Sequence, residues 1–315
     1  MNEKQRAGHQ PVRRAATRTN RIENMATSSV KRTEPTTGTD FKTFDDGAGG
    51  SKSQAVTLVD SAAAEITTLP VSLAQQEPFL LAVAKGNVAG HSLVLLSGSN
   101  SDIDSASAET IWNGSTIFDP VTLAGTLSIA SGDANDTAAG TGARTITIYG
   151  LDANYDALVE TIALDGVTPV VTTGEFIAVN SCEVDTVGTG GSNAGEITAT
   201  NGAIIMFVMP LGNNRTALGF YTSPAGKTVF LSRYNVSQSN ASASELYASL
   251  SVREGTTSPI RKVAHFGANA QGGIVDGDFQ FSVSLPEKSF LRWDASVSSN
   301  NNRVNASTVI LLVDD

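Results

Sequence analysis

The chain has 315 residues and a formal net charge of -10, and only 17% of its residues are charged while 6% are aromatic. This length accommodates two compact domains at about 100–200 residues per domain. The abundance of Gly, Ser, Thr, Ala and Asn disfavours long helices and favours short strands joined by tight turns, so the composition predicts an all-β protein.

Charge is distributed unevenly along the chain. Residues 1–34 carry eight Lys or Arg residues and three acidic residues, about +5, which leaves about -15 for the remainder. An acidic body repels nucleic acid, so duplex binding by the body is excluded and stays open only for the N-terminal part.

Residues 1–55, the arm, lack apolar periodicity and are rich in Thr, Ser, Gly, Arg and Asp. Because such a segment cannot form its own core, we expect an extended arm that orders when it docks on a partner. Its start has no apolar signal-peptide core, and no run of 18 apolar residues follows anywhere. We therefore expect a chain made in the cytoplasm without a membrane span, with Met25 as an alternative start to Met1.

Residues 56–84 are predicted to form a linker with short strands. Three β-like runs fall at 55–59, 65–69 and 78–83, and a short helix around 62–65 is the alternative.

Two stretches after the linker show the pattern of antiparallel sheets. Between 85 and 202, apolar and polar residues alternate at 126–129 and 144–149, and turn residues stand at 131–133, 150–152 and 165–166. Between 203 and 315, longer runs at 227–231, 246–252, 279–285 and 307–313 follow without helical periodicity. We predict two antiparallel β-sandwich domains, 85–202 and 203–315, the second jelly-roll-like or Greek-key, preceded by the extended N-terminal arm.

Single residues that could carry chemistry are scattered. His9, His91 and His265 lie on three segments, and none has a metal-binding spacing to another ligand. Cys182 is the sole cysteine, so we expect a small buried apolar residue that forms no internal disulfide and no zinc site. Five carboxylates alternate with apolar residues, as solvent-facing strand positions do: Glu160, Asp165, Glu175, Glu183 and Asp185.

Three partial motifs are interpreted as loops. The GKT ending at 226–228 has Tyr221 where a phosphate-binding loop needs glycine. The segment 100–105 alternates oxygen ligands as a calcium loop does, but Ser105 and Ile111 replace the required Gly and Glu, so a solvated turn is expected and an incidental cation is the alternative. At 190–194, Ala194 replaces the last glycine of a nucleophile elbow. No catalytic residue, metal site or cofactor is predicted.

Turns and strand edges between residues 88 and 315 carry a set of short sequence blocks. They are GHSLV at 90–94, ETIWNG at 109–114, SGDANDTAAGTGART at 131–145, GLD at 150–152, ETIALDG at 160–166, GEIT at 195–198, YTSPAGKT at 221–228, LPEK at 285–288 and LVDD at 312–315. Together they resemble a family of uncharacterised tailed-phage structural proteins. The resemblance leaves the arm unmatched and implies a virion component at the head, neck or tail, without assigning a role to any residue.

These observations favour a non-enzymatic virion subunit, a capsid decoration or cement protein first and a neck or tail accessory protein, connector or fibre-associated, second. A carbohydrate-binding adhesin is a further alternative, although it would need exposed aromatic residues beyond Trp112, Trp293 and five tyrosines. A tail depolymerase would need a carboxylate pair in a cleft and usually a repetitive β-helix, which the sequence lacks.

The arm provides the predicted interaction residues. We expect four arginines to pair with carboxylates of an acidic neighbour, another copy of the body included, and two phenylalanines to act as apolar anchors: Arg13, Arg14, Arg18, Arg21, Phe41 and Phe44. A solvated tail without a partner and contact with packaged DNA are the alternatives. The expected partners are other virion proteins, either the major capsid protein or neck and tail subunits, and further copies in a trimer or larger ring. The expected location is the virion, assembled in the host cytoplasm.

Overall fold

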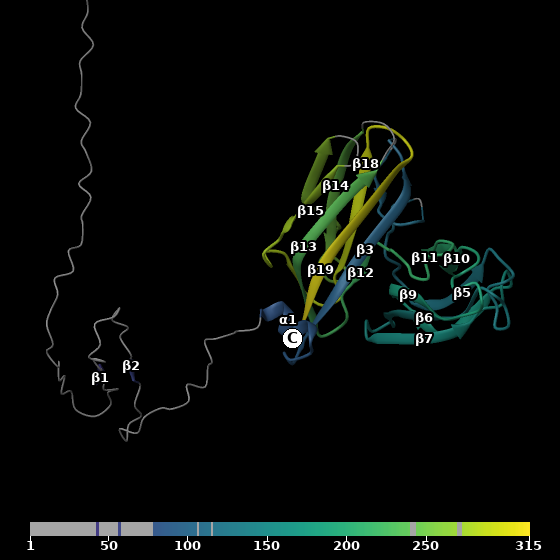
Figure 1. Ribbon diagram of the computed structural model, residues 1–315, viewed down its shortest axis with the longest axis horizontal. Coiled ribbons are helices and arrows are strands. Elements are labelled where there is room, and N and C mark those ends of the chain that lie inside the picture. Colours follow the sequence, from purple (N-terminus) through teal and green to yellow (C-terminus); the bar gives the residue numbers. More distant parts are fainter. Residues whose placement is uncertain are drawn as a thin grey trace, which may run out of the picture. The chain divides into compact units, whose positions relative to one another are not determined.

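The computed structural model describes residues 78–105, 107–114, 116–239, 244–269 and 273–315, together with 42–43 and 56–57 (Figure 1). Residues 78–315, the body, belong to one compact unit. Its strands pair antiparallel throughout, so the predicted all-β class is confirmed. Among the described residues, no helix is long and apolar enough to cross a membrane.

Two sheets of the body combine strands from both ends of its sequence. One has the order β16-β13-β19-β3, with β17 beside β13, and the other has the order β12-β18-β14-β15, with β4 beside β18. The bounds are β3 (His91–Ile103), β4 (Glu109–Thr110), β12 (Phe220–Thr222), β13 (Lys227–Ser239), β14 (Glu245–Arg253), β15 (Arg261–Asn269), β16 (Ile274–Asp278), β17 (Ser284–Leu285), β18 (Phe290–Val297) and β19 (Asn302–Asp314).

Two further sheets come from the sequence between β4 and β12, and their teal strands form a separate group in Figure 1. One has the order β11-β10-β5-β8 and the other β7-β6-β9. The bounds are β5 (Gly125–Ser131), β6 (Ala143–Leu151), β7 (Ala157–Ala163), β8 (Val170–Phe176), β9 (Ala178–Val187), β10 (Ile197–Asn201) and β11 (Ile204–Met209).

Each pair of sheets buries its own apolar core. In β19 every second residue from Asn302 to Ile310 is buried, as expected for a strand with one face against a core. Leu250 of β14 and Trp293 of β18 belong to the same core as β19, which we call the outer core. Leu127 of β5 and Ile146 of β6 belong to the core of the strands between β4 and β12, which we call the inserted core. Full burial of one such aliphatic side chain contributes about 1.5–3 kcal/mol, so the two cores account for most of the driving force.

The strand pairing differs from the expected division at residues 202 and 203. β3 pairs with β19 over most of its length, and β11 pairs with β10, so the strands from 125 to 209 form an insertion within a unit built from both flanks. The sequence could not indicate this, because alternation marks a strand without naming its partner.

The stretch 78–83 was expected to be extended, but it begins the helix α1 (Phe79–Ala84). Pro78 stands at its N-cap, where the missing N–H costs nothing, and Gly86 adopts a φ of 74° just beyond its end. Further upstream, β1 (Lys42–Thr43) pairs with β2 (Val56–Thr57). All other residues of the predicted arm and most of the predicted linker lie outside the described residues.

The expected strand at 279–285 is mostly a turn. Only Ser284–Leu285 is extended, and Gln280 and Phe281 adopt φ values of 50° and 58°. The ring of Phe279 lies 4.7 Å from Tyr234 and 6.4 Å from Phe266, so packing against the outer core outweighs the local β pattern.

Candidate functional site

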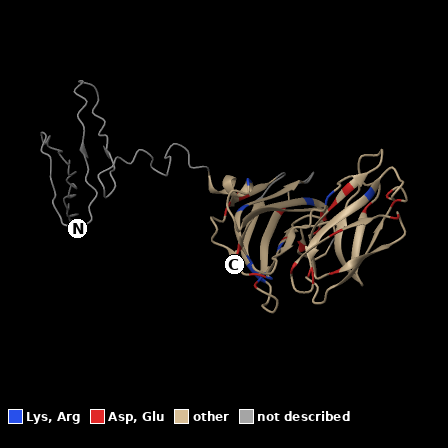
Figure 2. Ribbon diagram, turned by 90° about the horizontal axis from the view of Figure 1, so that it is seen from below, with Lys and Arg blue, Asp and Glu red and all other residues tan. Residues whose placement is uncertain are grey.

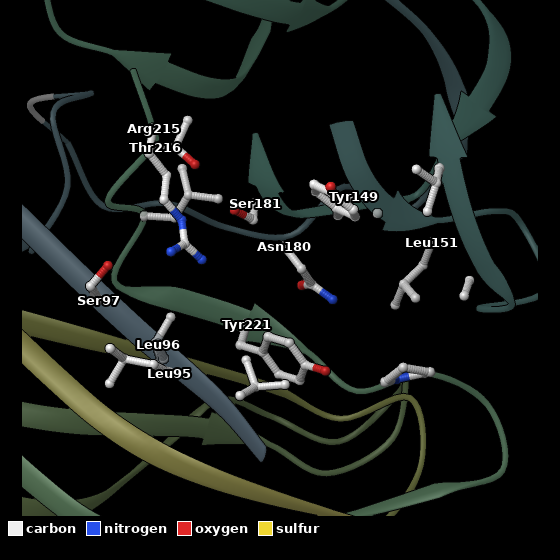
Figure 3. A pocket seen from close by; sticks show the side chains of 16 residues that line it. Leu95, Leu96, Ser97, Tyr149, Leu151, Asn180, Ser181, Arg215, Thr216 and Tyr221 are labelled. Atoms are coloured by element: carbon white, nitrogen blue, oxygen red, sulfur yellow. The ribbon is translucent and has the colours of Figure 1, made fainter. Parts of the chain in front are cut away.

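A groove opens between β3 and the strands β6, β7 and β9, with a volume of about 260 Å³ (Figure 3). Its walls are mainly apolar, and two outward-facing side chains stand out: Leu95 is 59% exposed and Val159 is 57% exposed. Tyr221 and Arg215 point into the same space. The groove therefore exposes apolar surface that an isolated chain leaves in contact with water.

A side-chain clamp joins β9, in one wall of the groove, to β12. The Asn180 amide donates to the carbonyl of Thr222 at 2.8 Å, and the Thr222 N–H donates back to Asn180 Oδ1 at 2.8 Å. Thr216 likewise accepts from the Cys182 N–H at 3.0 Å. Both contacts join β9 to the chain entering or forming β12, so the groove is preformed.

Close backbone approach at one end of the groove requires glycine. A Cβ on Gly98 would lie 2.4 Å from the Ile111 carbonyl oxygen and 2.6 Å from the Cα of Gly219. Gly219 has a φ of 65°, and its own Cβ would lie 2.3 Å from the same carbonyl. Side chains at either position would separate β3 from the segment leading into β12.

The electrostatics of the groove are simple. Among its lining residues, all of them described, Arg215 is the only charged one. Burial raises the pKa of Tyr221, so its hydroxyl stays neutral. The hydrogen bond that Tyr149 donates to Glu183 at 2.9 Å is the main cause of the raised pKa of the Tyr149 phenol. Arg215 is therefore the one charged residue that lines the groove, and the carboxylate of Glu183 lies beside it at Tyr149.

An aromatic and ionic junction links the inserted strands to β12 and β18. The rings of Phe118 and Phe220 stack with centroids 3.8 Å apart. The guanidinium of Arg292 pairs with Asp119 and, at 3.0 Å, with the buried carboxylate of Asp294. Because a charge buried without a partner would be costly, this ion pair fixes the place where the inserted chain leaves the outer sheets.

A buried carboxylate organises the loops of the inserted strands. Asp136 is fully buried and accepts from Ser131 Oγ at 2.5 Å and from three backbone N–H groups. These belong to Ala143 at 2.7 Å, Ala194 at 2.7 Å and Gly195 at 2.9 Å. The stretches at 131–145 and 188–195, glycine-rich in the sequence, are thus tied together around one side chain.

The residues considered for chemistry are engaged elsewhere. Glu160 accepts from the N–H groups of Thr173 and Gly174, both at 2.8 Å, and so joins β7 to β8. Lys227 of the GKT turn pairs with Asp314. Burial raises the pKa of the Cys182 thiol well above its usual range.

No group of three or more His, Cys, Asp or Glu side chains that could hold a metal ion occurs among the described residues. The nitrogen Nδ1 of His91 lies 2.8 Å from the carbonyl oxygen of Ala89, and His265 is on the separate strand β15. At 100–105, Asn100 binds the side chain of Glu109 at 3.1 Å as β3 ends.

The six predicted interaction residues of the arm lie outside the described residues, so their contacts stay a prediction: Arg13, Arg14, Arg18, Arg21, Phe41 and Phe44. The groove itself was missed, because its walls come from distant strands. One local signal was available: the β7 sequence ALVETIA carries apolar residues at both phases of its alternation, which a strand with one solvated face does not need.

No protein-family model matches the chain, and no curated protein matches it by sequence. Among solved structures, it is similar to a chain of the infectious bursal disease virus Gx strain, with 6% identity, a TM-score of 0.20 and coverage of 71% of this chain and 76% of that one. A chain of the T13 particle of the same virus gives 8% identity, a TM-score of 0.21 and coverage of 71% and 70%. A chain of the VP2 subviral particle of this virus gives 7% identity, a TM-score of 0.17 and coverage of 71% of this chain and 72% of that one. These scores are too low to support an argument about fold or function.

Proposed function

We propose that this chain is a non-enzymatic structural subunit of a tailed-phage virion, and that its arm joins one copy to the acidic body of a neighbour. The observation that carries the proposal is charge complementarity within one chain. The body has 22 acidic and 11 basic residues, whereas residues 1–34 have eight basic and three acidic ones. Figure 2 shows the Asp and Glu residues spread over strands and loops of the body.

The contacts in the body support a structural role. Two sets of its buried charged groups are engaged within the fold: Asp136 accepts from backbone N–H groups, and Arg292 pairs with Asp294. Such contacts fix loops and the junction between the two groups of strands. In this proposal each pair of sheets is an antiparallel β-sandwich, and the outer one is jelly-roll-like. The body is a rigid module, and the arm attaches it to a neighbouring copy.

Within the virion, the proposed place is the head, as a capsid decoration or cement subunit on the major capsid protein. A neck or tail accessory role is the alternative, and a trimer or larger ring is the proposed assembly. The adhesin alternative loses its two tryptophans, because Trp112 and Trp293 are 2% and 0% exposed and cannot stack on a sugar, and it keeps Tyr149 and Tyr247 as exposed tyrosines.

Removal of residues 1–44 tests the proposal. The truncated chain should stay folded and soluble, because both cores lie within 78–315, but it should no longer enter particles. Two full-length variants with the same loss of positive charge distinguish ion pairing by particular arginines of the arm from an effect of the arm's total charge. Four substitutions to Gln at Arg13, Arg14, Arg18 and Arg21 should reduce incorporation. The same number of substitutions at Lys4, Arg6, Lys31 and Arg32 should reduce it less. Normal incorporation of the truncated chain would overturn the proposal.

A further inference from the structure

We infer that the groove between β3 and the strands β6, β7 and β9 is the receptor for the aromatic segment 41–46 of a second copy's arm. This inference rests on the proposed function, since it gives the arm a defined docking site. It commits to one occupant, a Phe side chain of Phe-Lys-Thr-Phe-Asp-Asp.

The size of the groove suits one aromatic ring. A cavity of about 150 Å³ lined by aliphatic and aromatic side chains binds a benzene molecule. Pockets for drug-sized ligands and cofactors begin at about 300 Å³. At about 260 Å³, the groove holds one Phe ring with part of its backbone and is small for a cofactor.

The surface chemistry also suits this occupant. Leu95 and Val159 present apolar surface from opposite walls, and an inserted ring would remove both from water. Phe41 and Phe44 are the only aromatic residues among residues 1–77, so the arm carries its apolar anchors in a single place.

Charge complementarity favours Phe44 as the inserted residue. Asp45 and Asp46 follow it directly, and Arg215 is the one charged residue lining the groove. With the ring of Phe44 in the groove, the two carboxylates can approach the guanidinium of Arg215. This ion pair would set the direction in which the segment crosses the groove.

The chain length permits docking on another copy. Lys42 pairs with Thr57, so residues 58–77 set the reach of the segment, and these 20 residues span up to about 66 Å at about 3.3 Å per residue. A reach of this size lets one subunit hold a neighbour, which is what an assembly arm must do.

Disulfide trapping between full-length chains tests the inference. Thr43→Cys, which keeps the ring of Phe44, in one preparation and Val159→Cys in an isotopically labelled preparation are mixed and oxidised. A disulfide-linked mixed dimer is expected, and the native Cys182 does not compete because it is fully buried. Val171→Cys on β8 is the matched control, since Val171 is also 57% exposed but does not line the groove.

Two results of this experiment would overturn the inference. The first is a yield of mixed dimer with Val159→Cys no higher than with Val171→Cys. The second is a double variant, Thr43→Cys with Val159→Cys, that forms only a disulfide within one chain, because the arm would then dock on its own body.

A second measurement separates this inference from the proposed function. Val159→Arg should lower the number of copies per particle by about tenfold, which corresponds to about 1.4 kcal/mol of docking free energy, and Val171→Arg should not. If wild-type chains enter particles and Val159→Arg chains enter equally well, the groove inference fails while the proposed function stands. If wild-type chains are absent from particles, the proposed function fails.

Discussion

Replacement of Asp136 by Asn should destabilise the inserted strands in a residue-specific way. The amide oxygen can keep the position of Oδ1 and accept from Ala143 and Ala194, while the hydroxyl of Ser131 turns to accept from the new NH₂ group. The N–H of Gly195, which donates to Oδ2, then faces a donor and has no acceptor. One orphaned buried N–H and the loss of charge-assisted bonds together cost about 2–4 kcal/mol.

The thermal midpoint should therefore fall by about 5–15 °C, since about 1 kcal/mol shifts it by about 2–4 °C in a body of this size. Hydrogen exchange of the full-length chain gives the sharper assay, because the Gly195 amide should lose protection while those of Ala143 and Ala194 keep most of theirs. Asp133→Asn is the control: its carboxylate serves only the exposed loop at Asn135, and the change should be below about 0.5 kcal/mol. Unchanged protection of Gly195 would refute this reasoning.

Three further predictions follow from other contacts. Burial raises the pKa of Glu109 above its ordinary 4.5, so the folded state keeps a proton that the unfolded chain has lost. The free energy of unfolding should then fall as pH rises from 4.5 through the raised pKa, and Glu109→Gln should make this fall smaller. Plots of the free energy of unfolding against pH that run parallel for the wild type and the variant would contradict this prediction. Asn180→Ala should cost about 1–3 kcal/mol in urea unfolding, because Thr222 loses two partners, whereas Ser181→Ala should be nearly neutral. Cys182 should be inert to a thiol reagent in the native chain and react once on denaturation; rapid native labelling would show that its site is open.

Local pattern was sufficient to find several strands. The runs at 126–129, 144–149 and 307–313 lie within β5, β6 and β19, because a strand with one buried face must alternate. The short apolar run at 78–83 failed as a strand because runs of this length fit either a strand or a helix. At 279–285 the contacts of Phe279 with distant aromatic residues decided the conformation.

The candidate site was less accessible from the sequence. The groove depends on the pairing of β3 with β19 and on the clamp between Asn180 and Thr222, contacts between residues far apart in the chain. Such contacts leave no local pattern. The carboxylate of Asp136 was likewise invisible, because acidic loop residues are usually solvated and only the fold encloses this one.

The central claim is that this chain is a structural part of a particle. Its most direct test is to purify particles, separate heads from tails and quantify the chain in each fraction by mass spectrometry against the major capsid protein. The proposal predicts hundreds of copies with the heads for a decoration or cement subunit, whereas a few copies at the neck or tail would indicate the accessory role. Absence of the chain from both fractions would contradict the account.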